Sequence, residues 1–278
     1  MGKLRSIISL LRLSDQLLLV FAILVGNFFL TPSLNFQTIS IVIFIVSLTS
    51  LTFVINDLAD AKLDKLNKKT RNPIAQNKIS SKEAKLFAVI LFVLTLVISS
   101  FLHTNLFYYS LMLIFISITY GFFIKAKSKP PLDLVYHGLG PTIGFLMLSS
   151  LYKPFNLSIA FTAIIIFNIF SIIQLLQQIR DFDTDKKLVK TTAILLGKRN
   201  SIKACIILLV LSILILVSSV LEGAYTIKSL LFLPLSYLLF EPLFTAANNK
   251  IHTDRLLTIF TKRLFVATAF SVLLSMVL

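Results

Sequence analysis

The segment INDLADAKLDKLNKKTRNP, residues 55–73, spaces one asparagine and three aspartates as a helix face would require. On a helix of about 100° per residue, Asp60 and Asp64 lie about 40° and 80° from Asn56. Asp57 lies at about 100°, so the four polar side chains share one face. Like charges at this spacing destabilise a helix, and a cation must offset their repulsion. Oxygen ligands of this kind suit Mg²⁺.

Basic residues surround this acidic face without interrupting it. Lys62 and Lys65 lie on the opposite side of the same predicted helix, and Lys68, Lys69 and Arg71 follow it. Mg²⁺ takes one or two carboxylates and completes its shell with water and substrate phosphates, to which Lys and Arg also donate. The alternative is a solvated helix end at a membrane interface, where aspartates are merely tolerated.

A second acidic cluster lies in IIQLLQQIRDFDTDKKLVKTTAILLG, residues 172–197. On a helix, Gln174 and Gln178 lie about 20° and 60° from Asp181. Asp185 lies at about 40°, so the four side chains form one polar stripe. Amides inside a lipid-embedded helix are costly unless they face a cavity or a partner, which predicts that the stripe lines an interior pocket. A hydrogen-bonded seam between helices is the alternative for the glutamines.

The two clusters together indicate one kind of ligand. Asp183 and Arg180 point away from the second stripe, which leaves a clean acidic face there as well. Two acidic faces, each followed by Lys or Arg, predict a site for a polyanion bridged by Mg²⁺. A pocket with apolar walls and metal ligands at one edge suits a molecule with an apolar tail and a diphosphate head.

The helices that carry these clusters are predicted to span a membrane. Hydrophobic residues form 56% of the chain and charged residues only 14%, and the mean hydropathy is +0.90. Apolar stretches of about 20 residues, the length that crosses the hydrocarbon core, recur along the chain. We expect an all-α polytopic membrane protein, a single domain over residues 1–278 with its helices bundled around a central cavity. About nine spans are predicted, at 14–31, 36–55, 86–102, 106–124, 133–152, 157–179, 202–221, 226–246 and 261–278.

Positive charge marks one side of the membrane. With an internal N-terminus, every Lys and Arg except Lys153 and Lys228 falls on inner segments, the bias that the positive-inside rule describes. The N-terminus and two long inner loops, 57–85 and 180–201, are therefore expected on the cytosolic side of a cell membrane. We assign the net charge of +15 to anionic lipid headgroups rather than to nucleic acid. The single cysteine, Cys205, excludes a disulfide framework, and no obligate protein partner is indicated.

These features resemble the UbiA superfamily of intramembrane prenyltransferases. The string NDLADAKLD is similar to that family's Asn-Asp-x-x-Asp-x-x-x-Asp element. The string IRDFDTDKKLVKTTAILLG is similar to its second Asp-x-x-x-Asp element with the trailing Lys-Thr and Leu-Gly, especially in the form seen in naphthoate prenyltransferases. The number of spans, both motifs and their order agree, so the likeness covers nearly the whole chain.

The resemblance implies a role for each residue of the motifs. One Mg²⁺ would be held by Asn56, Asp60 and Asp64, with Asp57 adjacent, and the other by two further aspartates. The expected catalytic carboxylates are Asp60, Asp64, Asp181 and Asp185, the expected diphosphate-binding residues are Arg71, Lys190, Arg12 and Lys125, and the candidates for the pocket or acceptor site are Gln174, Gln178, Tyr120, Asp133 and His137.

Two segments depart from the family pattern. The family commonly has Arg-Pro after the first motif, whereas this chain has RNPI at residues 71–74, which leaves the register of Arg71 open. The segment KSKPPLDLVYHGLGP, residues 127–141, is more similar to archaeal-type enzymes, including those that prenylate carotenoids. Within it, His137 either orients or deprotonates an acceptor or packs between helices. Asp133 either contributes to the pocket or caps its helix.

The function implied is transfer of a prenyl group from an allylic prenyl diphosphate to an aromatic, quinone-precursor or lipid acceptor, with Mg²⁺ as cofactor and release of diphosphate. A carotenoid prenyltransferase of the lycopene elongase type and a glyceryl-lipid prenyltransferase are alternatives within the family. A cation-coupled transporter would place its acids near the bilayer midplane in broken helices, whereas these acids lie at one edge. A non-catalytic lipid-binding or assembly protein would not need every metal ligand to be retained.

Overall fold

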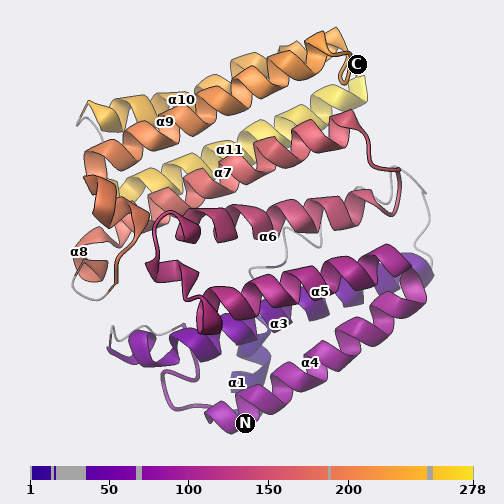
Figure 1. The fold of residues 1–278 in the computed structure, drawn as a ribbon, viewed down its shortest axis with the longest axis vertical. Coiled ribbons are helices and arrows are strands. Elements are labelled where there is room, and N and C mark those ends of the chain that lie inside the picture. The colour runs from indigo at the N-terminus through magenta and orange to yellow at the C-terminus, as the bar shows by residue number, and fades with distance from the viewer. Residues whose placement is uncertain are drawn as a thin grey trace. The chain divides into compact units, whose positions relative to one another are not determined.

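The described part of the chain is helical and contains no strand, which confirms the all-α prediction (Figure 1). It forms two compact units, Met1–Lys125 and Ala126–Leu278, and each unit is described by itself. A single domain over the whole chain stays a prediction. The computed structural model describes residues 2–13, 16, 36–66, 71–186, 189–248 and 253–277.

Unit 1 is built around α3 (Phe36–Leu66), which packs against α4 (Ser81–Leu102) and α5 (Thr104–Ile118). Phe44 and Leu51 are among the fully buried side chains of α3. Close packing of such side chains stabilises the contacts between helices, so the apolar contacts of α3 hold the unit together. The remaining elements of unit 1 are α1 (Gly2–Leu10) and a π-helical turn, η1 (Thr119–Phe123), that continues α5.

Helix α3 extends beyond its apolar stretch and carries the whole first motif. The sequence predicts an inner loop over 57–85, whereas α3 continues through the motif and α4 begins inside that range. Asp57 and Asp64 are buried while Lys62 and Lys65 are exposed, so the helix keeps one inner and one outer face after the apolar residues end. The predicted helical face of the motif is therefore confirmed, and the loop that follows is shorter than expected.

Buried hydrogen bonds fix the segments that lead to this motif. The Gln16 amide donates to the Ser50 hydroxyl at 2.9 Å and joins the segment after α1 to α3. The Thr95 hydroxyl of α4 donates to Ser47 of α3 at 3.1 Å. Polar side chains between apolar helices are stabilising when they are paired in this way. As a result, Arg12 at the end of α1 lies beside the first motif.

Unit 2 is built around α7 (Leu157–Arg180), which packs against α6 (Leu132–Ser149), α9 (Thr192–Leu221) and α11 (Thr253–Val277). Fully buried side chains of α7 such as Leu175 form the centre of its core. The other elements of unit 2 are η2 (Ala126–Ser128), α8 (Phe182–Asp185), η3 (Ile227–Phe232) and α10 (Leu233–Ala247).

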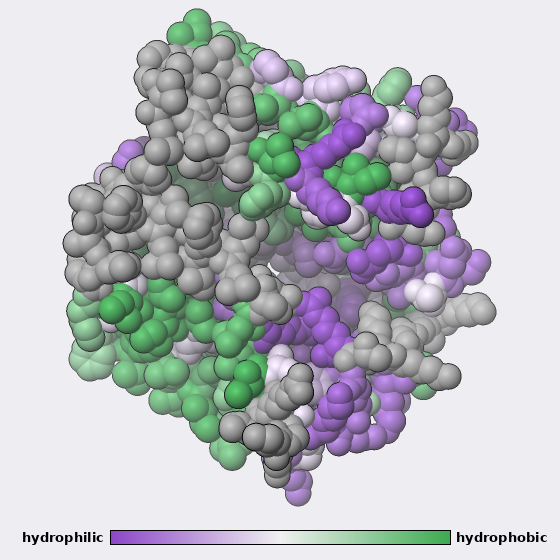
Figure 2. Space-filling view, turned by 180° about the vertical axis from the view of Figure 1, so that it is seen from behind, coloured by the Kyte–Doolittle hydropathy of each residue, from purple (hydrophilic) through white to green (hydrophobic). Residues whose placement is uncertain are grey.

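Exposed apolar side chains indicate which helices contact lipid. Within the described residues, five helices are long and apolar enough to cross a membrane: α3, α4, α5 with η1, α7 and α9. Figure 2 shows broad apolar areas on the surface, with the hydrophilic residues gathered in patches. On α4, for example, Leu86, Val89, Ile90 and Val93 are exposed. Apolar surface of this extent fits a bilayer, so this is a polytopic membrane protein.

The remaining predicted spans are only partly accounted for. Spans 133–152, 226–246 and 261–278 correspond to α6, to η3 with α10, and to α11. The span predicted at 14–31 lies outside the described residues apart from Gln16. The total of nine spans therefore stays a prediction.

A buried polar network joins three helices of unit 2. Asp133 at the start of α6 is fully buried and accepts hydrogen bonds from Gln178 Nε2 at 2.8 Å and from the Thr192 N–H at 2.6 Å. The Thr192 hydroxyl also donates to Asp133, and Gln178 Oε1 accepts from the Ala193 N–H at 3.0 Å. The first N–H groups of a helix have no partner within it, so this network caps α9 and fixes it against α6 and α7.

Helix α9 is broken at Gly197. The φ of 76° and ψ of 157° at this residue lie outside the helical region, in a conformation that glycine adopts readily and other residues do not. The first turn of α9 therefore remains hydrogen-bonded to the Asp133 network. The membrane-spanning part of the helix begins after the break.

Two glycines of α6 provide a matched test of its packing against α7. An added Cβ at Gly138 would lie 2.7 Å from Phe167 Cδ2 and 2.8 Å from Ser171 Oγ, whereas at Gly144 no heavy atom of the described residues lies within 4 Å. Gly138→Ala is expected to destabilise the protein by about 1–3 kcal/mol despite the better helix propensity of alanine. Gly144→Ala should leave the melting temperature in detergent unchanged or raised. Equal effects of the two substitutions would contradict the close approach at Gly138.

The Asp133 network makes a second prediction about stability. Asp133→Asn places an amide donor where the carboxylate accepts several hydrogen bonds, which should lower the free energy of unfolding by about 1–3 kcal/mol. Asp183→Asn, the same substitution at an exposed aspartate of unit 2, serves as the control and should change the thermal midpoint little. The measurement is thermal unfolding of both purified variants in the same detergent, and similar midpoints would rule out a stabilising role for Asp133.

Candidate functional site

The first acidic cluster lies on the buried face of α3 near its C-terminal end. Asp57 is 2% exposed and Asp64 is 7% exposed, while Asn56 and Asp60 are half-buried. The carboxylates of Asp60 and Asp64 lie close enough to Asp57 to repel its charge. The structure thus brings three carboxylates together on one helix face, as their spacing predicts.

Arg12 supplies a counter-charge to this cluster. Its guanidinium forms an ion pair with Asp57 and lies 5.1 Å from the centroid of the Phe53 ring. The pairing offsets the cost of burying the carboxylate. Among the described residues, Arg12 Nε and Asp57 Oδ2 still have no hydrogen-bond partner. A buried carboxylate oxygen without a hydrogen-bond partner needs a physical explanation, and a metal ion bound to that oxygen provides one.

Two more basic residues predicted to bind diphosphate belong to unit 1. Partial burial and, second, repulsion from Arg12 lower the pKa of the Arg71 guanidinium, so the two arginines share one neighbourhood. Arg12 and Lys125 have φ values of 49° and 51°. This left-handed conformation is uncommon outside glycine and is often retained at functional sites.

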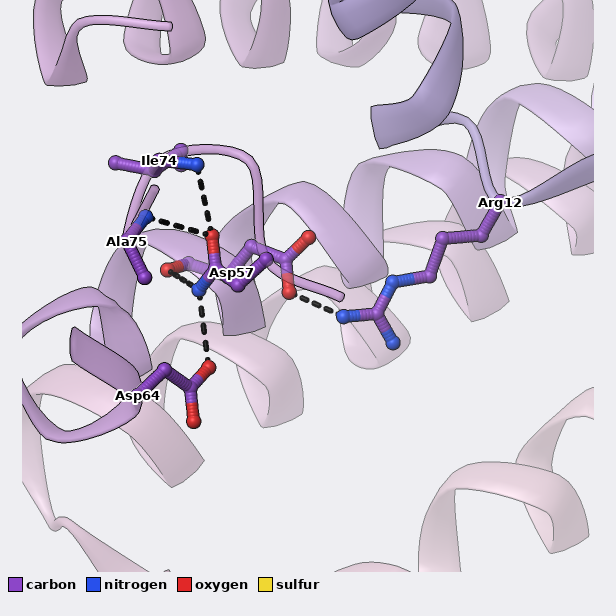
Figure 3. A network of polar contacts seen from close by, with 6 residues as sticks. Arg12, Asp57, Asp64, Ile74 and Ala75 are labelled. Carbon is purple, nitrogen blue, oxygen red and sulfur yellow. Dashed lines mark hydrogen bonds and ion pairs between the residues drawn. The ribbon is translucent and has the colours of Figure 1, made fainter. Parts of the chain in front are cut away.

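One residue that the sequence analysis did not single out joins this site. Asn72 is 1% exposed, and its Nδ2 donates to Asp64 Oδ2 at 3.0 Å and to the Asp57 carbonyl at 2.8 Å (Figure 3). It stands directly before Pro73, where the family resemblance implies an arginine. That departure was the sequence signal for Asn72, and it also explains why Arg71 stands one residue earlier.

The second acidic cluster forms one turn where α7 ends. The Asp185 N–H donates to the Asp181 carbonyl at 2.9 Å, so the two aspartates follow one another by one helical turn. Arg180 was expected to point away, but its Nε and Nη2 donate to Asp181 at 2.8 and 3.0 Å. It folds back because its side chain is about half exposed and stands next to an acid where the helix stops. An exposed pair of this kind contributes little and can be exchanged for a stronger cation.

Asp183 lies apart from this pair, as predicted. Lys198 donates to it at 2.8 Å, and this hydrogen bond lowers the pKa of Asp183. The Lys198 ammonium also lies 5.3 Å from the centroid of the Phe182 ring. Asp183 is therefore held in a surface contact with α9, and Lys190, the predicted phosphate ligand of unit 2, is exposed.

The predicted pocket residues have different surroundings. Asp133 and Gln178 are held in the network that caps α9, which supports the capping alternative for Asp133. Gln174 is buried on α7, while Tyr120 and His137 are half-buried, and their place in the pocket stays a prediction. The two lysines at positions 68 and 69 lie outside the described residues.

The donor set of the acidic clusters fits Mg²⁺. In the described parts of the chain, no three His, Cys, Asp or Glu side chains converge into a ready-made metal cage. Mg²⁺ at phosphate-binding sites needs no such cage, because water and substrate oxygens complete its shell. Asp57 Oδ2, a buried anionic oxygen without a hydrogen-bond partner among the described residues, is the kind of hard ligand that Mg²⁺ prefers.

Solved structures of similar fold come from membrane prenyltransferases and their homologues. A structure of digeranylgeranylglyceryl phosphate synthase has a TM-score of 0.74 at 19% identity, over 96% of this chain and 97% of that one. A UbiA homologue from Archaeoglobus fulgidus, bound to DMAPP and Mg²⁺, has a TM-score of 0.73 at 20% identity, over 98% and 100%. An apo UbiA homologue from Aeropyrum pernix K1 has a TM-score of 0.69 at 15% identity, over 97% of each chain.

Sequence comparison establishes the family. No curated protein sequence matches this chain. The profile of the UbiA prenyltransferase family matches residues 19–271, which include both acidic motifs and nearly all of the helices described above. This chain therefore belongs to the UbiA prenyltransferase family, whose members are membrane-bound transferases of prenyl groups.

Proposed function

We propose that this protein transfers a prenyl group from an allylic prenyl diphosphate to a hydrophobic acceptor, in an Mg²⁺-dependent reaction that releases diphosphate. The observation that carries the proposal is the acidic face of α3, where Asp57 keeps an unpartnered buried oxygen among the described residues beside the Arg12 and Arg71 guanidiniums. Grouped carboxylates and arginines suit a metal together with a polyanion. The two Archaeoglobus fulgidus structures bound to GPP or DMAPP with Mg²⁺ add support from the same fold.

Each acidic motif has its own part in this proposal. Mg²⁺ when bound neutralises charge on the diphosphate and makes it a better leaving group. In unit 1 the metal would be held by Asn56, Asp57, Asp60 and Asp64, and in unit 2 by Asp181 and Asp185.

The basic residues of the chain would bind the diphosphate, and its apolar residues would exclude water. The allylic C–O bond breaks with its electron pair on the diphosphate, and the acceptor attacks the resulting carbocation and loses a proton. Arg12 and Arg71, with Lys125 and Lys190, would donate hydrogen bonds to the diphosphate oxygens as their charge develops. The apolar helices exclude water that would quench the carbocation.

The acceptor is the part of the proposal that most needs experiment. Similarity in fold to digeranylgeranylglyceryl phosphate synthase favours a glyceryl-lipid acceptor, while segment 127–141 favours a carotenoid. Aromatic and quinone-precursor acceptors are the third class. Membranes that contain the protein should be incubated with labelled prenyl diphosphates of several lengths and one acceptor of each class.

The distribution of Lys and Arg supports placing the acidic motifs on the cytosolic side.

Removal of the metal tests the cofactor. Diphosphate release from a prenyl diphosphate should stop when EDTA is added to the purified protein and return when Mg²⁺ is restored. The acids need an added cation because their repulsion would otherwise exclude the substrate's negative charge. Diphosphate release that continues unchanged in EDTA would remove Mg²⁺ from the mechanism.

Two neighbouring aspartates test the assignment of the second motif. Asp185→Asn should reduce turnover by about 100-fold or more, the scale of losing one electrostatic contact to the transition state. Asp183→Asn is the control, because Asp183 is engaged by Lys198 on the surface, and its turnover should stay near that of the native protein. Asp60→Asn should behave like Asp185→Asn. If Asp60→Asn and Asp185→Asn both retained near-native activity at saturating Mg²⁺, the metal assignment would be wrong.

A further inference from the structure

The Asn72 side chain uses its full hydrogen-bonding capacity inside unit 1. Its Nδ2 donates to Asp64 Oδ2 at 3.0 Å and to the Asp57 carbonyl at 2.8 Å. Its Oδ1 accepts from the backbone N–H groups of Ile74 and Ala75 at 3.0 and 3.3 Å. An amide has two donor hydrogens and two acceptor lone pairs, and all four are engaged here. Figure 3 shows Asp57 and Asp64 of α3 facing the turn that contains Ile74 and Ala75, with hydrogen bonds drawn between the helix and the turn.

These hydrogen bonds connect α3, which carries the acidic motif, to the turn that follows Arg71. The donor side holds α3 at two points, Asp57 and Asp64, which lie about two helical turns apart. The acceptor side shapes the buried turn that follows Arg71, since Pro73, Ile74 and the next residue are also buried. One neutral side chain therefore sets both the orientation of a carboxylate and the position of the adjacent arginine.

The chemistry of the contact favours a role in metal binding over a purely structural one. A hydrogen bond to one oxygen of a carboxylate fixes the rotation of that group and hence the direction of its remaining lone pairs. The neutral amide holds Asp64 without removing its charge.

We propose that Asn72 is a positioning residue that orients the Asp64 carboxylate for divalent-metal binding and holds the Arg71 turn against α3. This inference rests on the proposed function, because it assumes that Asp64 is a metal ligand. It adds a residue outside the acidic motif to the determinants of metal affinity.

The substitution Asn72→Asp tests this directly. It keeps an acceptor for the Ile74 and Ala75 N–H groups and so preserves the turn, but it removes the donation to Asp64 and adds a like charge. The Mg²⁺ concentration for half-maximal diphosphate release should rise by about 10-fold or more, the scale seen when partners of metal ligands are removed. Asn77→Asp is the matched control, because Asn77 is exposed in the same turn and should leave the Mg²⁺ response unchanged.

Three further measurements separate orientation from folding. Mn²⁺ binding without substrate, followed by electron paramagnetic resonance, should weaken in Asn72→Asp and not in Asn77→Asp. Combining Asn72→Asp with Asp64→Asn reverses donor and acceptor at the Asp64 contact but leaves the Asp57 carbonyl without its donor. Thermal stability should therefore recover in part, while the Mg²⁺ response should not recover. Asn72→Ala and Asp64→Asn should also be non-additive when combined, because one acts through the other.

The outcomes distinguish this inference from the function on which it rests. If Asn72→Asp lowers thermal stability but binds Mn²⁺ and responds to Mg²⁺ like the native protein, Asn72 is only structural and the inference fails. If Asp64→Asn itself leaves Mn²⁺ binding and the Mg²⁺ response unchanged, the proposed metal role of Asp64 fails first. A weakened metal response in both single variants supports the two together.

Discussion

A buried carboxylate needs a partner, and this requirement governs both units of the protein. A buried carboxylate has little water to solvate its charge, so each buried acid must be paired, hydrogen-bonded or bound to a metal. Asp57 is paired with Arg12, Asp64 is held by Asn72, and Asp133 accepts from two helices at once. Asp181, which stays partly exposed, makes an ion pair with Arg180 that can be exchanged.

The two units meet this requirement in different ways. Unit 1 brings cations and an amide to the motif from segments before and after α3, so its acidic face depends on residues distant in sequence. Unit 2 keeps its buried network separate from its acidic motif: Asp133 and Gln178 stabilise the helices, while Asp181 and Asp185 remain at the end of α7. In unit 2 a buried hydrogen-bonded network thus supports an acidic motif that remains available at the end of α7. This arrangement is suited to binding a charged ligand.

Sequence alone predicted the all-α fold and the acidic face of α3, because both follow from short-range periodicity. The burial of Asp57 and Asp64 opposite Lys62 and Lys65 was expected from a helical plot. Partners across the fold could not be predicted in this way. No spacing rule joins Asn72 to Asp64 or Asp133 to Thr192, since each pair depends on how a turn or a second helix packs.

Local changes in backbone conformation could not be predicted from the sequence either. The π-helical turn that carries Tyr120 lies in a stretch whose composition reads as continuous helix. The break at Gly197 lies inside α9, a helix that begins within the predicted loop 180–201. Asn72 did leave a trace, as an unexpected residue before Pro73, but its meaning became clear only when the amide was seen between two aspartates.

The structure of the N-terminus of α9 affects how a negatively charged ligand can bind beside it. The open N-terminus of a helix attracts phosphate groups through its free N–H groups and its dipole. Here the protein's own carboxylate, Asp133, already fills that position and satisfies the Thr192 N–H. The Thr192 N–H is therefore not available to an incoming anion. A polyanion near Lys190 would depend on cationic side chains and metal ions instead of the dipole of α9.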